Sequence, residues 1–253
     1  MVLAIDIGNS NIVLGGYEKK RLRFLARLTS DRQMEAEEYA VKLRAILDLH
    51  GVLAVPIEQV VLASVVPAVT QVMVRALGFL TKAVPHVFSL ADAKDVQVVI
   101  DNPAELGTDI LASAVAVRHT RPLPAVIIDM GTATKITALD EDGRLLGVAI
   151  SPGLFVSLEA LISNASQLQG IPLAAPPAAI GRNTANSIKS GVVLGNAAML
   201  DGMIDRFAAE MGGGLATVIA TGGAAGIVVP HCRNRVELCE TLLLDGLLHA
   251  MAQ

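Results

Sequence analysis

Short apolar runs that end at turn residues alternate with helical stripes along the first half of the chain. The stretch Val2–Ile7 is apolar except at Asp6, and Gly8 follows it, which is typical of a buried strand that ends in a turn. Between residues 35 and 50, apolar residues recur at helical spacing behind an acidic start, which favours a helix. The expected strands of this half are Val2–Ile7, 12–17, 22–28 and 59–66, and the expected helices are 35–50 and 67 to about 79.

The second half repeats this order of elements. Ala125–Met130 is again an apolar run with one Asp, and further strands and helices follow it. Hairpins followed by strands that alternate with helices predict an α/β fold with mixed sheets. We therefore expect duplicated actin-like, ribonuclease H-like halves, 1–120 and 121–253, with a cleft between them and a boundary at "RPLP" (121–124). The expected strands are Ala125–Met130, 135–140, 144–150 and 216–221, and the expected helices are Leu154–Ser163, 180–211 and 239–251.

One short motif stands at the end of the first strand in both halves. It reads "AIDIGNSN" at residues 4–11 and "IIDMGTAT" at 127–134. A Gly after a strand permits a tight bend that presents backbone N–H groups to an anion. Neighbouring amides and hydroxyls (Asn9, Ser10 and Asn11, and Thr132 and Thr134) add donors for phosphate oxygens.

The aspartates of the two motifs, Asp6 and Asp129, have the same sign of charge as phosphate and would repel it. Each must therefore act through a cation, such as Mg²⁺ with its waters. Phosphate-binding turns beside such carboxylates indicate a nucleotide and a metal held by two similar halves. The alternative is that Asp and Gly serve only the geometry of a hairpin turn, but their repetition in matching positions argues against it.

A third feature points to a nucleotide. "VIATGGAAG" at 218–226 is a strand that runs into Gly222 and Gly223, and such flat backbone suits an adenine or a ribose. The sequence has no P-loop, no G-x-G-x-x-G after its first strand and no protein-kinase signature. The repeated turns are therefore the expected phosphate site.

Composition narrows the classes of function. A net charge of −4, 3% aromatic residues and no Trp argue against a nucleic-acid partner, which normally requires a basic patch. Charged residues, Pro or Gly interrupt every apolar run before the roughly 20 residues of a membrane span, so we expect no membrane partner. Two Cys, and a start that reaches Asp6 too soon for a signal peptide, favour a reduced, cytoplasmic protein. High hydrophobicity with few charges favours an oligomer.

The ordered set of motifs resembles one kinase family. Two Asp-x-Gly turns and a late Thr-Gly-Gly are the pattern of the acetate and sugar kinase/Hsp70/actin superfamily. "DIGNSN", "NPAELGTD" (102–109), "DMGTAT", "ISPG" (150–153) and "ATGG" together closely resemble type III pantothenate kinase, nearly end to end. The resemblance implies ATP-dependent phosphorylation of pantothenate to 4'-phosphopantothenate, the first step of coenzyme A biosynthesis. It also implies a homodimer whose active sites lie at the subunit interface.

The resemblance assigns roles to residues by position. Asp109 would be the catalytic base, Asp129 would hold a monovalent cation (K⁺ or NH₄⁺), and Asp6 would hold the Mg²⁺ of ATP through water. The ATP- and phosphate-binding residues would be Asp6, Ile7, Gly8, Asn9, Ser10, Asn11, Ile12, Val13, Gly131, Thr132, Gly222 and Gly223. The pantothenate pocket would be lined by Gly107, Thr108, Asp109, Ile110 and Thr184.

Asp109 has a structural explanation beside the catalytic one. It precedes the apolar helical run "ILASAVAVRH", so its carboxylate could cap that helix. As a base it would accept the proton of an attacking hydroxyl, while positioning and charge stabilisation supply most of the catalysis. The two roles do not exclude each other.

Several pocket positions depart from the family pattern. Ile110 stands where Arg is usual, Ile100 stands where Tyr is common, and 163–168 lacks an expected Arg-Thr pair. One lost charge-assisted hydrogen bond would cost about 1.5–3 kcal/mol, which weakens substrate binding about ten- to a hundredfold. A divergent pantothenate kinase therefore competes with an altered paralogue, either a nucleotide-binding regulator or a kinase for another hydroxy-acid acceptor.

Lys135 stands where Thr is usual after the second turn. Its ammonium could supply the positive charge that a bound K⁺ supplies elsewhere in the family. Alternatively, it points to solvent on the return strand.

Overall fold

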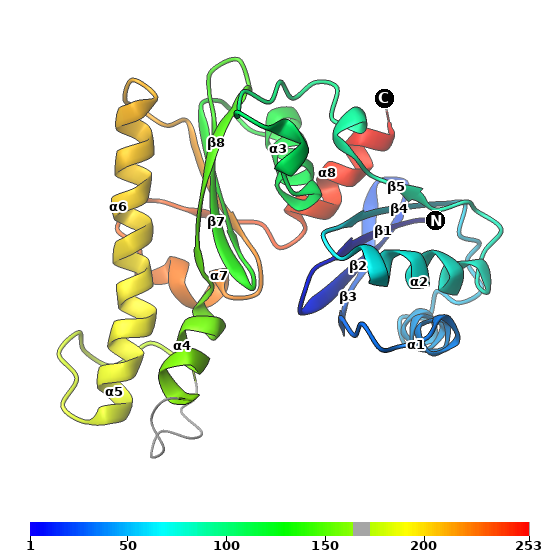
Figure 1. Cartoon of the computed structure of the whole chain (residues 1–253), viewed down its shortest axis with the longest axis horizontal. Coiled ribbons are helices and arrows are strands. Elements are labelled where there is room, and N and C mark those ends of the chain that lie inside the picture. The colour runs from blue at the N-terminus through cyan, green and yellow to red at the C-terminus, as the bar shows by residue number, and fades with distance from the viewer. Residues whose placement is uncertain (164–172, 253) are drawn as a thin grey trace. The chain divides into compact units, whose positions relative to one another are not determined.

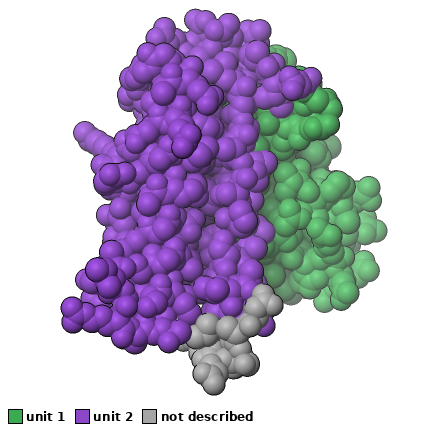
Figure 2. Space-filling view, turned by 60° about the vertical axis from the view of Figure 1, so that its left-hand side comes forward, with its two compact units in different colours: residues 1–95, 102–119, 241–253 green, residues 96–101, 120–240 purple. Residues whose placement is uncertain are grey.

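The computed structural model describes residues 1–163 and 173–252. Contacts divide the chain into two compact units (Figure 2). Unit 1 comprises residues 1–95, 102–119 and those from 241 onward, and unit 2 comprises 96–101 and 120–240. Each unit contains one five-stranded sheet with parallel and antiparallel neighbours, which confirms the expected α/β class with mixed sheets.

The sheet of unit 1 has the strand order β3-β2-β1-β4-β5 (Figure 1). The central strand β1 pairs antiparallel with β2 and parallel with β4. Ile7 lies opposite both Ile12 and Ser64, so the end of β1 lies beside the end of β4. The strands are β1 (Val2–Ile7), β2 (Asn11–Glu18), β3 (Arg21–Thr29), β4 (Gln59–Ser64) and β5 (His86–Val87).

Helices cover both faces of this sheet. Leu3, Ile5 and Ile7 pack with α1 (Ala36–Leu49) and α2 (Pro67–Gly78) in one core, while α8 (Leu242–Met251) contacts β1 and β4. A capping box between Glu35 and Glu38 begins α1, and a Pro in the first turn begins α2, as is usual at helix starts. The remaining helices of unit 1 are α3 (Thr108–Thr120) and the 3₁₀ turns η1 (Leu90–Asp92) and η2 (Pro103–Glu105).

The sheet of unit 2 repeats this topology with the order β10-β9-β6-β7-β8. Its central strand β6 also pairs antiparallel with the next strand and parallel with a later one, β9. The same hairpin-then-crossover plan in both units agrees with the expected duplication. The strands are β6 (Ala125–Met130), β7 (Ala133–Leu139), β8 (Leu145–Pro152), β9 (Thr217–Thr221) and β10 (Glu237–Leu238).

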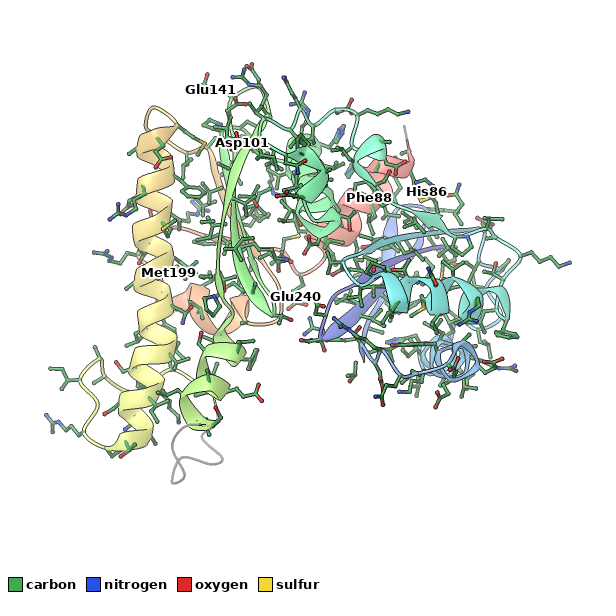
Figure 3. The ribbon with its side chains drawn as sticks, in the orientation of Figure 1. His86, Phe88, Asp101, Glu141, Met199 and Glu240 are labelled. Carbon is green, nitrogen blue, oxygen red and sulfur yellow. The ribbon has the colours of Figure 1, made fainter. Side chains whose placement is uncertain are left out.

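The long helix α6 (Gly195–Glu210) covers one face of this sheet (Figure 1). Its buried Leu200 and Ile204 pack against Ile128 and Met130 of β6, and Met199 lies on the same helix (Figure 3). The sequence predicted one helix over 180–211, whereas the structure divides it at a π-helical turn. The helical segments of unit 2 are α4 (Leu154–Ser163), α5 (Thr184–Lys189), the π turn η3 (Ser190–Leu194), α6, α7 (Ala225–Val228) and the 3₁₀ turn η4 (Val229–His231).

The end of the chain differs from the expectation. The predicted helix over 239–251 begins only at Leu242, because Glu237 and Leu238 pair with β9 as β10. This helix, α8, belongs to unit 1, so the units do not divide the chain into the halves 1–120 and 121–253. All but the first residue of 163–168, where an Arg-Thr pair was expected, lies outside the described residues. Across the described parts of the chain, none of the helices is long and apolar enough to cross a membrane.

Candidate active site

The first Asp-x-Gly motif forms a tight hairpin turn between β1 and β2. The N–H of Gly8 donates to the carbonyl of Asn11 at 3.0 Å, so Asn9 and Ser10 form the tip, and both are exposed. The side chains of Ile7 and Ile12 are fully buried. These two predicted phosphate-binding positions can therefore offer a ligand only their main chain.

Arg32 is a residue at this turn that the sequence analysis missed. Its Nη2 donates to Oδ1 of Asn9 at 3.0 Å, and the N–H of Ser30 donates to the carbonyl of Ser10 at 3.0 Å. Both contacts follow from the β2–β3 register, in which Asn11 lies opposite Thr29. A guanidinium beside a proposed phosphate turn suits an anion, because its N–H groups bind phosphate oxygens well. The sequence could have indicated Arg32 only if the register of the β2–β3 hairpin had been inferred, because that register brings the end of β3 beside the turn.

Asp109 lies in the first turn of α3, in unit 1. Its Oδ1 accepts the N–H of Ile110 at 2.8 Å, and the carboxylate is half-buried. Because α3 begins at Thr108, Asp109 is inside the helix and not at its N-cap. A Cβ on Gly107 would collide with Oδ1 of Asp109, so a side chain there would displace the carboxylate from its observed place. The local backbone therefore favours the observed place of the carboxylate.

The other predicted pantothenate-binding residues have different surroundings. Ile110 is only 9% exposed and packs inward, and the Thr108 hydroxyl bonds to the backbone of Ser64. Thr184 is the exposed first residue of α5, in unit 2. The structure thus places Gly107 to Ile110 on one turn of unit 1 and Thr184 in the other unit.

The second Asp-x-Gly motif forms a turn one residue shorter than the first. The N–H of Gly131 donates to the carbonyl of Ala133 at 3.1 Å, and that of Gly153 donates to the carbonyl of Thr132 at 3.0 Å. A Cβ on Gly153 would collide with the carbonyls of Gly131 and Thr132. Gly153, from "ISPG", therefore supports the turn by close backbone approach, which requires the absence of a side chain.

The Thr-Gly-Gly motif packs against the same turn. Gly222 has a positive φ of 93°, and a Cβ there would lie 2.6 Å from the carbonyl of Met130. The N–H of Ala224 donates to that carbonyl at 3.2 Å, and Gly223 is exposed. The structure thus places Gly222 against the backbone of Met130, the residue directly before Gly131 and Thr132.

Asp129 and Lys135 form an ion pair across the β6–β7 hairpin. The residues lie directly opposite each other, and Nζ of Lys135 is 2.6 Å from Oδ2 of Asp129. Both side chains are mostly buried, with 16% of Lys135 and 22% of Asp129 exposed. The alternative that Lys135 points to solvent is therefore wrong.

Thr134 does not serve the turn as predicted. Its side chain is fully buried, and its hydroxyl has no hydrogen-bond partner. Because strand residues alternate between faces, Thr134 points to the face opposite Lys135, towards the core with Ile136. The prediction that this hydroxyl binds phosphate is wrong.

The carboxylates beside the two Asp-x-Gly turns suit a hydrated divalent cation. In the residues that the structure describes, no three His, Cys, Asp or Glu side chains form a ready-made metal cage. Mg²⁺ keeps several waters and binds through one or two carboxylates plus phosphate oxygens. A half-buried carboxylate such as that of Asp6, beside a phosphate-binding turn, fits this kind of site.

Comparison with known proteins identifies the class and then the family. An activator of 2-hydroxyisocaproyl-CoA dehydratase from Clostridium difficile, solved with bound ADPNP, has a similar fold; the TM-score is 0.57 at 14% identity, over 98% of this chain and 92% of that one. The duplicated units, each with an Asp-x-Gly turn after its central strand, define an actin-like fold. The family model for type III pantothenate kinase matches residues 2–206.

Two relatives with that name match almost the whole chain. The type III pantothenate kinase of Moorella thermoacetica is 40% identical over 98% of this chain and 97% of its own length. That of Geotalea uraniireducens is 36% identical over 98% and 96%, respectively. The chain belongs to the type III pantothenate kinase family, and it is an enzyme of the kinase class that uses ATP with a divalent metal.

Proposed function

We propose that this protein transfers the γ-phosphoryl group of ATP to the primary hydroxyl of pantothenate, giving 4'-phosphopantothenate and ADP. This reaction is the first step of coenzyme A biosynthesis. The observation that carries the proposal is a half-buried carboxylate, Asp109, at the start of α3 in a chain that matches the family over nearly its full length.

Asp109 is the catalytic base in this proposal. Its carboxylate accepts the proton of the pantothenate hydroxyl as that oxygen forms its bond to the γ-phosphorus and the bond from phosphorus to the ADP oxygen breaks. Proton acceptance by a positioned base contributes a factor of roughly 10² to 10⁴. The rest of the rate enhancement comes from orientation and charge stabilisation.

The two hairpin turns bind phosphate oxygens. Backbone N–H groups and the tip side chains of 8–11 and 131–132 donate hydrogen bonds, and Arg32 adds positive charge at the first turn. When bound, Mg²⁺ neutralises charge on the transferring phosphoryl group, and the Asp6 carboxylate would hold it through water. Gly222 and Gly223 would contact the nucleoside.

In this proposal, a side chain of the protein takes the place of the monovalent cation that is expected at Asp129. The ammonium of Lys135 is bonded to that carboxylate and supplies a single positive charge. The duplicated half offers a comparison, because Asp6 lies opposite Val13 at the corresponding register position. A lysine directly opposite the motif aspartate is therefore found at the second turn, where Asp129 faces Lys135.

A homodimer is also part of the proposal. Several exposed apolar side chains gather on β8 and the following helix α4, and β8 is the edge strand of its sheet. A second copy of the chain would cover this face, as the family resemblance implies. The residues are Leu146, Ile150, Phe155, Val156 and Leu161. We further propose a cytoplasmic location, which is consistent with a sequence of only two cysteines, Cys232 and Cys239.

The test is a coupled ADP-release assay with pantothenate and a panel of other hydroxy acids. We expect pantothenate-dependent ADP release that falls about 10²- to 10⁴-fold in Asp109→Asn, with ATP binding retained. Asp101→Asn is the matched control, because Asp101 is an exposed loop carboxylate (Figure 3). ATP binding without turnover of pantothenate would contradict the proposal, and turnover of another acid in its place would identify a different acceptor.

A further inference from the structure

At the end of β4, Ser64 has β1 as its neighbour on one side but extends past the end of β5 on the other. In a parallel sheet, alternate residues of a strand bond to opposite neighbours. The carbonyl of Leu62 accepts the N–H of Phe88, which follows β5. Because Ser64 is two residues further along β4, its backbone N–H and C=O point to the same side as those of Leu62. Because β5 ends at Val87, none of the described strands reaches the N–H and C=O of Ser64 on that side. Both groups require another partner, since buried backbone polar groups are nearly always paired.

The side chain of Thr108 is that partner. Its Oγ1 accepts the N–H of Ser64 at 3.1 Å and donates to the carbonyl of Ser64 at 3.0 Å. A hydroxyl has one proton to donate, and here that proton is used. Thr108 thus takes the place of a strand residue and attaches the first residue of α3 to the end of β4.

The hydroxyl of Ser64 stiffens the same junction. Its Oγ accepts the N–H of Val66 at 3.0 Å and lies 2.6 Å from Oγ1 of Thr70. Oγ1 of Thr70 donates to Oγ of Ser64, and it also lies 3.0 Å from the carbonyl of Val66, which it can reach with the same proton. The segment that receives Thr108 is therefore held by α2 as well as by the sheet.

Asp109 is the residue next to this attachment. Its backbone follows directly from Thr108, and a Cβ on Gly107 would collide with its carboxylate. On the other side of the turn, Gly246 of α8 packs against the backbone of Ala112 so closely that a side chain would overlap it. The first turns of α3 are thus held by β4 and by α8.

We propose that Thr108 is a positioning residue that places the carboxylate of Asp109 through its two bonds to Ser64, and is not a ligand of the acceptor. This inference rests on the proposed function, in which Asp109 is the base. A base displaced by about 1 Å loses up to roughly a hundredfold in rate, because the transfer depends on alignment. Substrate affinity depends much less on this bond, since its partner is the backbone of the protein.

The experiment compares Thr108→Val, Thr108→Ser and Thr81→Val. Thr108→Val keeps the shape and removes both bonds, whereas Thr108→Ser keeps the hydroxyl. Thr81→Val is the matched control, because the Thr81 hydroxyl also donates to a backbone carbonyl (Ile57, 2.9 Å) and accepts a backbone N–H (Ala83, 3.0 Å). Ile57 precedes the start of β4, at the end opposite Ser64.

We expect Thr108→Val to lower kcat about ten- to a hundredfold, with KM for pantothenate and Kd for ATP each within about twofold of wild type. Thr108→Ser should recover most of the rate, and Thr81→Val should lower the melting temperature without lowering kcat. A raised KM for pantothenate with an unchanged kcat would make Thr108 a substrate ligand and overturn the proposal. An equal loss of kcat in Thr81→Val would also overturn it.

Amide hydrogen exchange distinguishes this inference from the proposed function. If wild type does not use pantothenate, the proposed function fails, but the attachment is still measurable at the amides of Ile110 and Leu111. Faster exchange there in Thr108→Val, with wild-type exchange in Thr108→Ser and Thr81→Val, supports the attachment. Unchanged exchange in Thr108→Val shows that the hydroxyl does not hold the turn, and then the inference fails whatever the substrate is.

Discussion

At the scale of single residues, equivalent positions of the duplicated motif have acquired different chemistry. Asp6 and Asp129 both precede an x-Gly turn, yet one lies opposite Val13 and the other opposite Lys135. A charge-assisted bond between mostly buried groups is stronger than one in water, because the local dielectric constant is lower. The carboxylate of Asp129 is therefore held in one orientation by its own strand partner.

Lys135→Met tests whether this ammonium replaces a bound cation. We expect wild-type activity to be the same with or without K⁺ or NH₄⁺, in a buffer of a large organic cation. The variant should lose about tenfold or more, since one charge-assisted bond is worth about 1.5–3 kcal/mol, and added K⁺ should restore part of the rate. Steady-state kinetics against K⁺ concentration measures both effects, with Lys42→Met on the exposed face of α1 as control. A strong requirement of wild type for K⁺ or NH₄⁺ would disprove the replacement.

At the scale of elements, α3 and α8 form a pair that is held at two levels. Gly246 permits close backbone contact in the middle, and the rings of His119 and His249 stack at the carboxyl ends, with centroids 5.2 Å apart. Oδ2 of Asp95 lies 3.2 Å from Nε2 of His119 at this end of the pair. Because α3 carries Asp109, the packing of the closing helix bears on the proposed catalytic carboxylate.

The histidine pair predicts a loss of stability in mild acid. Burial is the largest cause that holds the pKa of His249 below its ordinary value, and the neighbouring His119 and Lys20 lower this pKa further. The carboxylate of Asp245 raises it, but by less. The folded state therefore binds this proton less readily than the unfolded state, so stability falls as pH drops below about 6.5 towards the folded pKa. His249→Gln should lose less free energy of unfolding than wild type between pH 7.5 and 5.5.

Urea denaturation followed by far-ultraviolet circular dichroism measures this difference, since the chain has no Trp. His231→Gln, at an exposed histidine of unit 2, is the control and should behave like wild type. Equal pH dependence in wild type and His249→Gln would show that the pair does not couple protonation to folding.

At the scale of the whole molecule, each unit is built from separate pieces of the chain. The chain passes between the units at 95/96, 101/102, 119/120 and 240/241. The closing helix α8 returns to unit 1, where Tyr17 donates to Asp245 at 3.1 Å and Thr241 donates to the same carboxylate at 2.7 Å. Loss of the last dozen residues would therefore remove part of the core of the first unit.

The proposed dimer gives a prediction at this scale. Phe155 is 51% exposed on α4, beside the edge strand β8, and a charge there would have to be buried by a second copy. We expect wild type at twice the mass of the chain by light scattering and Phe155→Arg shifted to the single-chain mass at micromolar concentration. Leu49→Arg, at a residue 83% exposed on α1, is the control and should remain dimeric. A single-chain mass for wild type would rule out the dimer.

Local pattern by itself determined most elements and the position of the two turns. Apolar runs, Gly and Pro act over a few residues, so β1, β6 and α4 agree with the predicted bounds and most other boundaries differ by one to three residues. The π turn after α5 was not predicted, because its helical periodicity resembles that of an α-helix. The family motifs in order also led to the prediction that Asp109 is the base, which the assay of Asp109→Asn tests.

The contacts that these residues make could not be predicted from local pattern, because they form between separate segments of the chain, some of them distant in the sequence. Strand register decides three of these contacts. It pairs Asp129 with Lys135, it brings Arg32 to Asn9, and it turns the side chain of Thr134 towards the core. Thr108 and Ser64 are 44 positions apart in the sequence. The helix α8 comes from the end of the chain and belongs to unit 1, which also contains the beginning of the chain. Such contacts depend on which segments pack together, and this is set by the burial of the whole core rather than by the sequence around any one residue.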